Sequence, residues 1–173
     1  GENKFNIIKN KKVIVFGCGG VGGYVIEMLV RSGIENLTIV DFDTVSETNI
    51  NRQIIATIKT VGKLKVDCFK ERIFDINPNC KLNTIQQKLL PENIEQFDLK
   101  NYDYVIDCID MVTSKVELIK YCYDNNIKII SSMGTGNRSQ LPKLEITDIF
   151  KTENDGLAKI VRKLLKEKGV KKA

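Results

Sequence analysis

The sequence predicts an α/β fold with a doubly wound, mostly parallel sheet that is covered by helices on both faces. Short apolar runs alternate with longer segments of helical periodicity, which is the pattern of successive β-α units. A glycine-rich turn follows the first apolar run and opens a helical segment, as in Rossmann-like folds. With 173 residues, 42% of them apolar and 28% charged, the chain has the size and composition of one globular domain over 1–173.

The first half of the chain supplies three strands and two helices. The apolar run 12–16 is short and uninterrupted, as expected of a strand buried on both faces. Segment 21–32 carries apolar residues at helical spacing and ends before Gly33, a residue that favours helix C-termini. A second helical segment, 63–77, stops at Pro78, which cannot continue a helix. The other two strands of this half are expected at 37–40 and 81–86.

The second half continues the same alternation. A helix at 112–125 is predicted because Val116, Ile119 and Tyr123 recur at helical spacing. The remaining elements, in chain order, are a short helix or turn at 91–99, a strand at 104–107, a strand at 128–133, a loop at 139–143, one more strand at 144–149 and a basic C-terminal helix at about 156–168.

Composition excludes several kinds of function. No apolar run approaches the roughly 20 residues that span a bilayer, so we expect no integral membrane segment. The five cysteines lack Cys-x-x-Cys spacing, which argues against a zinc knuckle, and we expect reduced thiols in a cytoplasmic protein. There is no histidine, which excludes Ser-His-Asp catalysis and histidine-ligated metals. The chemistry must therefore use carboxylates, cationic side chains, backbone amides and a hard metal ion.

The net charge of +5 is concentrated at the C-terminus. Residues 1–150 carry 19 basic and 19 acidic groups, whereas residues 151–173 carry eight basic and three acidic groups. In the last predicted helix, the basic residues expected to face outward are Lys159, Arg162, Lys163, Lys166 and Lys168. Charge alone leaves two interpretations open, a solvated helix face and a surface for RNA.

A glycine motif marks the first turn as a nucleotide site. Gly17, Gly19 and Gly22 match the pattern G-x-G-x-x-G, and Gly20 adds a further glycine inside it. Glycine is needed where backbone amides approach a phosphate closely and a helix N-terminus points at it. The motif follows a predicted strand and precedes a predicted helix, which favours nucleotide binding over a purely structural turn.

Acidic residues follow two of the predicted strands, at the edge where the carboxyl ends of parallel strands form a crevice. Asp41 has the position of a side chain that accepts hydrogen bonds from ribose hydroxyls. Asp43 is a second candidate for the nucleotide site, with a turn residue as the alternative. Asp107 and Asp110 follow a later strand, and either suits Mg²⁺. The glycine-containing segment 134–137 is expected at the same edge.

Two cations follow the glycine motif, at Arg52 and Lys65. A dinucleotide dehydrogenase shares the glycine motif but has no use for them. A guanidinium can hold phosphoryl oxygens bidentately, and an ammonium adds a point charge. With Mg²⁺ they would oppose the charge that develops on departing pyrophosphate, which favours ATP as the nucleotide. The alternative is that both cations are incidental surface residues.

The string DFDTVSETNINRQ at 41–53, after G-x-G-G-V-G, resembles the ubiquitin-activating-enzyme (E1-like) superfamily, which includes the ThiF, MoeB and HesA types. The resemblance continues through GKLK at 62–65, INP at 76–78 and DCID at 107–110. It implies an E1-like adenylation domain that activates a carboxylate with ATP and Mg²⁺. It implies that, beside the glycine motif, Asp41 binds the ATP ribose and that Asn51, Arg52 and Lys65 bind the phosphates. The catalytic residues it implies are Arg52, Lys65 and Asp110, with Asp110 also as the metal ligand.

The segments 105–115, 118–122, 131–137 and 151–158 resemble one branch of that superfamily, the tRNA threonylcarbamoyladenosine dehydratases. This branch implies adenylation of the carboxylate of N6-threonylcarbamoyladenosine in tRNA, followed by cyclisation with loss of water. Its implied partners are the modified tRNA, a second copy in a homodimer, and cysteine-desulfurase or sulfur-acceptor proteins. The missing Cys-x-x-Cys pairs and the basic tail fit this branch better than the sulfur-carrier branches.

The resemblance also implies that the chain is shorter than family members at both ends, because they carry an arginine before the position of Gly1 and continue past Ala173. Two other functions remain open. One is a sulfur-carrier-protein adenylyltransferase of the ThiF or MoeB type. The other is an inactive nucleotide-binding scaffold that presents the basic tail to a partner.

Overall fold

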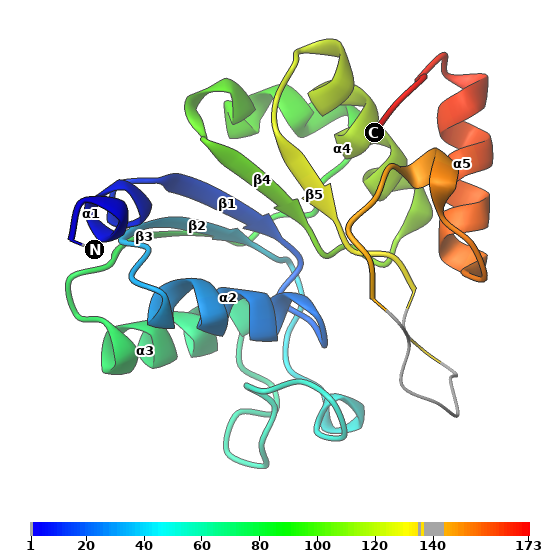
Figure 1. The fold of residues 1–173 in the computed structure, drawn as a ribbon. Helices are drawn as coiled ribbons and strands as arrows, with labels where there is room; N and C mark the ends of the chain where they lie inside the picture. Colours follow the sequence, from blue (N-terminus) through cyan, green and yellow to red (C-terminus); the bar gives the residue numbers. More distant parts are fainter. Residues whose placement is uncertain (1, 135, 137–143) are drawn as a thin grey trace.

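The computed structural model describes residues 2–134, 136 and 144–173. Its centre is a five-stranded sheet in the order β3-β2-β1-β4-β5, and every neighbouring pair is parallel (Figure 1). The strands are β1 (Lys12–Phe16), β2 (Asn36–Val40), β3 (Lys81–Ile85), β4 (Tyr104–Asp107) and β5 (Ile129–Ser131). The predicted doubly wound α/β fold is confirmed. The five predicted strands from 12–16 to 128–133 are present.

Helices cover both faces of this sheet, as the alternating pattern predicts. The α-helices are α1 (Glu2–Lys9), α2 (Gly22–Arg31), α3 (Lys65–Ile76), α4 (Val112–Asp124) and α5 (Gly156–Glu167). Short 3-10 helices occur at η1 (Glu47–Asn49), η2 (Pro91–Phe97), η3 (Leu99–Asn101) and η4 (Ile149–Lys151).

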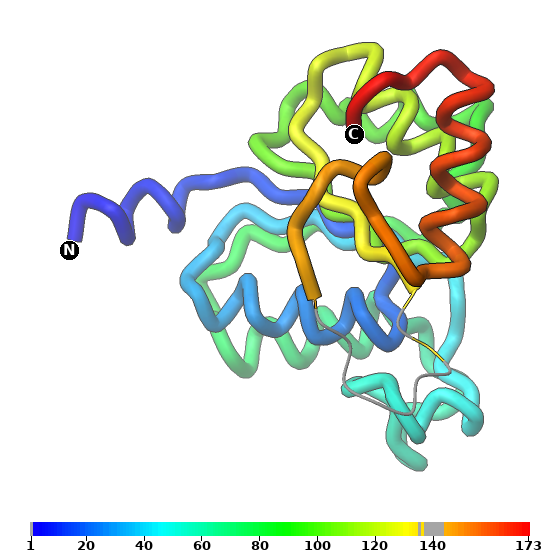
Figure 2. The backbone as a smooth tube through the Cα atoms, turned by 45° about the vertical axis from the view of Figure 1, so that its right-hand side comes forward, coloured from blue at the N-terminus to red at the C-terminus, as the bar shows by residue number. Residues whose placement is uncertain are grey.

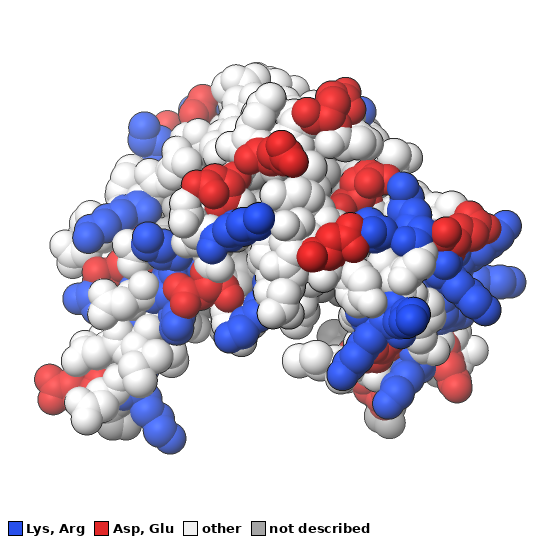
Figure 3. Space-filling view, turned by 90° about the horizontal axis from the view of Figure 1, so that it is seen from above, with Lys and Arg blue, Asp and Glu red and all other residues white. Residues whose placement is uncertain are grey.

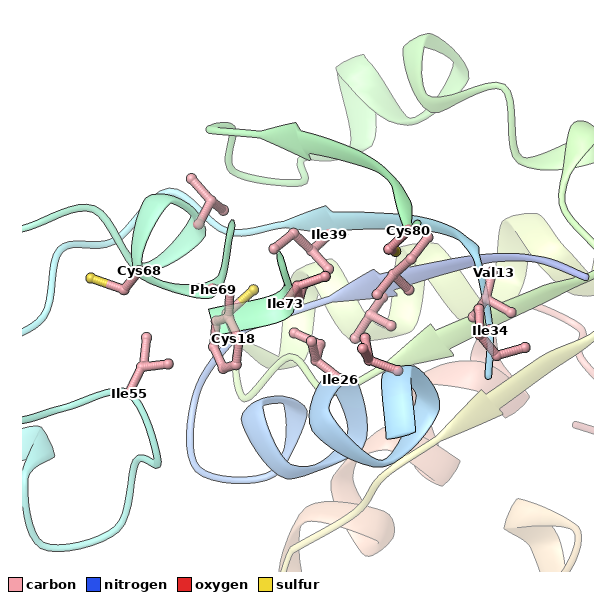
Figure 4. Packing of buried hydrophobic residues seen from close by; sticks show 14 of the residues in the cluster. Val13, Cys18, Ile26, Ile34, Ile39, Ile55, Cys68, Phe69, Ile73 and Cys80 are labelled. Carbon is pink, nitrogen blue, oxygen red and sulfur yellow. The ribbon is translucent and has the colours of Figure 1, made fainter. Parts of the chain in front are cut away.

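Alternate residues of β1 enter two different cores. Val13 and Val15 belong to a cluster with residues of α2 and α3, including Phe69 (Figure 4). Ile14 and Phe16 belong to a second cluster on the opposite face, with residues of η2 and α4. Both faces of β1 are covered, which explains why its sequence is continuously apolar.

A third core joins the last helix to the sheet. Val116 and Ile119 of α4 are buried together with Ala158, Val161 and Leu165 of α5. The helix α5 therefore packs on α4 and forms an outer layer at the β5 side of the molecule (Figure 1).

Two parts of the chain differ from the prediction. Residues 144–148 form no strand, and Leu144 and Ile146 are 77% and 92% exposed, because no sheet edge pairs with them. The helix α1 was not predicted; it has no buried residue and extends away from the body (Figure 2). The predicted loop at 139–143 lies outside the described residues. Among those described, no helix is both long and apolar enough to cross a lipid bilayer.

Candidate nucleotide site

The carboxyl ends of the three central strands are joined by backbone hydrogen bonds at one edge of the sheet. The Gly17 N–H, directly after β1, donates to the Val40 carbonyl at the end of β2 (2.9 Å). The Cys108 N–H, directly after β4, donates to the Phe16 carbonyl (2.8 Å). Residues far apart in sequence are thus brought to the same edge, as the sequence predicts for the nucleotide site.

The turn between β1 and α2 has no room for side chains at two of its glycines. Gly17 has φ +90°, and a Cβ there would lie 2.8 Å from the Cys108 carbonyl oxygen. A Cβ on Gly22 would lie 1.7 Å from the Gly17 carbonyl oxygen. Among the described residues, the N–H groups of Gly19 and Gly20 have no hydrogen-bond acceptor. Free amides at a helix N-terminus bind anions such as phosphate.

Arg52 lies directly over this glycine turn. Its Cγ is 3.5 Å from the point where a Cβ on Gly20 would be. Its Nη1 donates to the Thr48 carbonyl (3.1 Å) and to Asn51 Oδ1 (2.9 Å), which fixes the direction of the guanidinium. Its other nitrogens make no hydrogen bond to the described residues and are exposed beside the turn. The fold thus brings Arg52 and Asn51 to the predicted glycine site.

The segment that carries Arg52 is held by a local turn. The Asn49 side chain accepts a hydrogen bond from the Ser46 N–H (3.1 Å), which closes a capping box around η1. The Asn49 carbonyl in turn accepts from the N–H groups of Arg52 (3.1 Å) and Gln53 (2.9 Å). Sequence analysis assigned no role to Asn49, because the usual capping-box pattern has glutamate or glutamine, and not asparagine, three residues after the serine.

Gln53 provides a test of whether the turn fits a nucleotide. Its side chain is 7% exposed, and among the described residues Oε1 is the buried side-chain atom without a hydrogen-bond partner. Its Nε2 lies 3.7 Å from the point where a Cβ on Gly19 would be. The unpaired carbonyl oxygen costs about 1–3 kcal/mol, and a phosphate oxygen does not relieve it, because both atoms are acceptors. The Nε2 donor beside Gly19 can donate to a phosphate that the glycine amides hold, and this end of the side chain fits ATP.

Asp41 connects the end of β2 to the glycine turn. Its Oδ2 accepts from the Cys18 N–H (2.6 Å), and its Oδ1 accepts from the Asp43 N–H (2.8 Å). The residue is 8% exposed, so the carboxylate is fixed at the turn and retains lone pairs for further donors. This arrangement suits the predicted contact to ribose hydroxyls.

Lys65 is almost fully buried and is paired with Asp43. Its Nζ lies 2.8 Å from Asp43 Oδ2, and its N–H donates to the Asp43 carbonyl (3.0 Å). The side chain of Lys65 is 6% exposed and that of Asp43 is 47% exposed. The incidental-surface alternative for Lys65 is therefore wrong. Asp43 is not merely a turn residue, because it holds this ammonium group after the end of β2.

The two aspartates after β4 have different environments. Asp107 is fully buried; its Oδ2 pairs with Lys115 Nζ (2.7 Å) and accepts from Ser131 Oγ, and its Oδ1 accepts from the Ile109 N–H (2.9 Å). It is therefore unavailable for Mg²⁺. Asp110 is exposed and makes no hydrogen bond to the described residues, so of the two candidates it alone is available to a metal.

Lys115 was missed by sequence reasoning. Its side chain is fully buried, and its Nζ also donates to Ser131 Oγ (3.2 Å) and to the Ser132 carbonyl (2.9 Å). This ammonium group ties together the ends of β4 and β5 and the first turn of α4. A lysine on the same helical face as Val112 and Ile119 is the sequence signal that would have revealed it.

The cysteines near the site are poor nucleophiles. Burial, followed by the charge of Asp41, raises the pKa of the Cys18 thiol well above its ordinary value. Burial and the charge of Asp107 raise the pKa of Cys108 to about 12. Both thiols stay protonated at neutral pH, and only a thiolate attacks efficiently. The site therefore favours chemistry between bound substrates without a cysteine intermediate.

The described residues contain no site at which protein side chains alone could hold a metal ion. Among the described residues, no group of three or more cysteine, aspartate or glutamate side chains is close enough to hold a metal ion. Mg²⁺ is commonly held by one or two carboxylates together with substrate phosphates. The single free carboxylate of Asp110 fits that mode.

Residues 1–160 match the ThiF family. A Bacillus subtilis protein named tRNA threonylcarbamoyladenosine dehydratase is 43% identical over 172 residues, which cover 99% of this chain and 68% of that protein. The Escherichia coli protein of the same name is 39% identical over 166 residues, which cover 96% of this chain and 62% of that protein. The chain thus spans about two thirds of the length of these two relatives.

Solved structures show the same similarity. The crystal structure of the E. coli tRNA N6-threonylcarbamoyladenosine dehydratase in complex with ATP superposes with a TM-score of 0.93 at 38% identity, covering 96% of this chain and 68% of that one. The complex of that enzyme with AMP gives the same TM-score and identity.

Proposed function

We propose, because this chain belongs to the ThiF family, that it uses ATP to activate the carboxylate of N6-threonylcarbamoyladenosine in tRNA for cyclisation. Relatives that are 39% and 43% identical to it carry the name of this dehydratase, and solved structures of one of them contain ATP and AMP. The candidate residues for the nucleotide half of that reaction lie at one edge of the sheet, and this supports the proposal.

The proposed reaction has two steps. A carboxylate oxygen of the substrate attacks the α-phosphorus of ATP, the bond to the β-phosphate oxygen breaks, and pyrophosphate leaves. A nitrogen or oxygen of the same substrate then attacks the activated carbonyl, closes a ring and releases AMP, while the attacking group loses its proton. The substrate loses one water overall, and ATP becomes AMP and pyrophosphate.

Each residue at the site has a role in this proposal. The amides of Gly19 and Gly20 bind phosphate oxygens, and Asp41 accepts hydrogen bonds from the ribose. Arg52, Lys65 and Asn51 bind the phosphates, and the two cations oppose the negative charge that grows on the departing pyrophosphate. Mg²⁺, held by Asp110 and the phosphates, would neutralise part of the same charge.

The observation that carries the proposal is the position of Arg52 over Gly20. A guanidinium with free N–H donors, on a side chain that packs against a turn with free glycine amides, supports a site for several phosphates. The dinucleotide cofactor of a hydride-transfer enzyme has only two phosphates and loses neither of them, so such an enzyme does not need this additional cation. The arrangement therefore favours ATP cleavage over dehydrogenation.

The test incubates the protein with ATP, Mg²⁺ and tRNA that carries threonylcarbamoyladenosine. We expect AMP to appear in proportion to a nucleoside whose mass is lower by one water. The matched control is tRNA that lacks the modification, which should produce no AMP. Release of AMP without the mass change, or no AMP in either reaction although ATP binds, would reject the dehydratase function.

The two alternatives give different results in the same assay format. A sulfur-carrier adenylyltransferase would exchange pyrophosphate into ATP when given a small protein with a C-terminal Gly-Gly, and tRNA would have no effect. An inactive scaffold would bind ATP but catalyse no exchange with either substrate. Both are rejected if exchange depends on the modified tRNA.

A homodimer in the cytoplasm is the expected assembly and location. Exposed apolar side chains on α1 and α2, among them Phe5 (52%), Tyr24 (53%) and Met28 (63%), support a contact with a second copy. All five cysteines are unpaired, in keeping with a reducing compartment. Light scattering gives the mass in solution, and a monomer at all concentrations would reject the dimer.

A further inference from the structure

We propose that three lysines of α5, Lys159, Lys163 and Lys166, form the surface that binds the phosphate backbone of the tRNA substrate. We call these residues the lysine stripe. The inference rests on the proposed function, because it names the part of the chain that recognises the polynucleotide beyond the modified nucleoside.

The packing of α5 turns the lysine stripe toward solvent. Ala158, Val161 and Leu165 are fully buried against α4, and this fixes which side of the helix faces inward. The three lysines follow one another at i, i+4 and i+7, so they lie along one outward face, and all three are exposed. Over seven residues the stripe is about 10 Å long.

Arg162 is not part of this surface, contrary to the prediction that it faces outward. Its Nη1 donates to the Thr152 carbonyl (2.8 Å), the Thr152 hydroxyl (2.6 Å) and the Ile149 carbonyl (3.3 Å). The guanidinium fastens η4 to α5 and is half-buried. Basic residues of this helix thus divide into one structural arginine and a set of exposed lysines.

The lysine stripe is largely free of acidic partners. Among the described residues, Lys159 and Lys166 form no ion pair. Lys163 lies 4.0 Å from Glu167, with side chains 77% and 58% exposed, and so loose a surface pair contributes little. The ammonium groups are therefore available to an external anion. A solvated helix that served only to cover α4 would gain from neutralising pairs along its length.

The helix begins at the same edge of the sheet as the nucleotide site. Gly134 follows β5, and a Cβ on it would lie 3.2 Å from Asp155 Oδ1 and 3.4 Å from Leu157 Cβ. Asp155 caps α5 by accepting from the Ala158 N–H (2.8 Å), so the first turn of α5 is fixed beside this edge. The stripe therefore starts near the carboxyl ends of the strands and runs away from them along the outer layer.

In the space-filling view, lysine and arginine side chains, with some acidic side chains among them, gather on the right-hand side, where α5 lies in Figure 1 (Figure 3). When the modified nucleoside of a tRNA occupies the crevice at the carboxyl ends of the strands, the rest of the tRNA must extend past one side of that crevice. A row of free ammonium groups that begins at the crevice suits the repeating phosphates of the adjoining stem, and this chemistry favours RNA over a small substrate alone.

The test compares two variants with the same change in net charge. Lys159→Glu/Lys163→Glu/Lys166→Glu reverses the stripe. Its control, Lys70→Glu/Lys81→Glu/Lys100→Glu, reverses exposed lysines on α3, β3 and η3, and β3 is the sheet edge opposite β5. Binding of tRNA is measured by fluorescence anisotropy at several salt concentrations, and ATP binding and thermal unfolding are measured in parallel.

We expect the stripe variant to bind tRNA about 10- to 100-fold more weakly at moderate salt, with a salt slope reduced by roughly one for each lost phosphate contact. ATP affinity and unfolding temperature should match the wild type, and the control should bind tRNA far better than the stripe variant. Equal losses in both variants, or wild-type binding by the stripe variant, would overturn the inference.

A second comparison separates this inference from the proposed function. The isolated threonylcarbamoyladenosine nucleoside has no phosphates, so the stripe variant should cyclise it as fast as the wild type does. With whole tRNA the same variant should show a raised KM and an unchanged kcat. If the wild type binds tRNA through the stripe but dehydrates neither substrate, the proposed function fails and the binding surface stands.

Discussion

Lys115 and Asp107 form an ion pair of 2.7 Å in which both side chains are fully buried. The pair joins the end of β4 to α4, and the lysine extends the connection to the end of β5 through Ser131 and Ser132. The turn that this pair fixes contains Cys108, whose carbonyl lies against Gly17, and leads to Asp110. The proposed metal-binding side of the site is thus held against the phosphate-binding side.

We expect Lys115→Met to lower the free energy of unfolding by about 3–5 kcal/mol, because it leaves a buried carboxylate without its partner. The double variant Asp107→Asn/Lys115→Met removes both charges and should recover part of that loss. Urea denaturation measures both values. A single variant as stable as the wild type would show that the pair is not buried in solution.

Arg52→Ala should lower kcat for AMP formation by about 10²- to 10³-fold, as the loss of one transition-state donor does. The unfolding temperature should stay the same, because this side chain is exposed and its hydrogen bonds are to its own segment. Arg52→Lys keeps the charge but loses the bidentate geometry, so the rate of this variant should lie between those of the wild type and Arg52→Ala. A near-normal rate for the alanine variant removes Arg52 from the mechanism.

Gly22→Ala should abolish nucleotide binding and destabilise the fold, because its Cβ would lie 1.7 Å from the Gly17 carbonyl oxygen. The matched control is Gly156→Ala in the first turn of α5, where nothing lies within 4 Å of the new Cβ. That control should change the unfolding free energy by no more than about 1 kcal/mol, with alanine favoured. Titration with ATP and thermal melting distinguish the two, and equal behaviour would contradict the geometry of the turn.

Gln53→Met should raise the stability of the nucleotide-free protein while it weakens ATP binding. The substitution removes a buried carbonyl that has no donor, which is worth about 1 kcal/mol or more. It also removes the amide beside Gly19 that suits a phosphate oxygen. Denaturation and ATP titration of one sample test both effects. A loss of stability would show that the Gln53 amide is paired in solution.

Glu27 links α2 to α3, and its titration should make the free energy of unfolding depend on pH in the acidic range. It accepts hydrogen bonds from Arg72 (2.9 Å) and from Arg31 (2.8 Å). The hydrogen bond from Arg72, followed by that from Arg31, lowers the pKa of the Glu27 carboxyl below its ordinary value. The stabilisation is thus fully present above the unfolded pKa of about 4.3 and is lost as pH falls through the lower, folded value.

Glu27→Gln should therefore be less stable than the wild type by about 1 kcal/mol at pH 7. The gap should close below about pH 4, where the wild-type carboxyl also becomes protonated. Thermal melts of both proteins between neutral and acidic pH measure this, and a gap that stays constant with pH would assign the effect to packing.

Most of the fold could be predicted from the sequence, because the apolar patterns of its strands and of its helices are both strong. The buried strands are continuous apolar runs, and α2, α3 and α4 have clear apolar faces that end at glycine, proline or asparagine. The segment at 144–149 also has alternating apolar residues, yet a strand requires a neighbour with free hydrogen-bonding groups. Which edge is available is a property of the whole sheet, and a local pattern does not contain it.

The glycine turn and the cations of the site were predictable for a different reason. A phosphate is bound by glycine amides and cationic side chains, so these residue types stand out in the sequence. The parallel order of the strands then brings them together at one edge of the sheet. The partners that hold them, such as Asp43 for Lys65 and Lys115 for Asp107, depend on which side chains become buried. The same limit explains why Asp107 and Asp110 looked equivalent in sequence, although only one of them remains available to a ligand.

The central position of β1 also bears on how the protein is made. Val13 pairs with Leu37 on one side and with Tyr104 on the other. A ribosome adds about 5–20 residues per second, so one edge of β1 waits for roughly 5–20 s before β4 has been synthesised. Until then the growing chain has an open, apolar strand edge that can pair with other nascent chains. The strand order therefore leaves this early product prone to aggregation, and a ligand that contacts the turns after both β1 and β4 can assist folding only after the fourth strand has emerged.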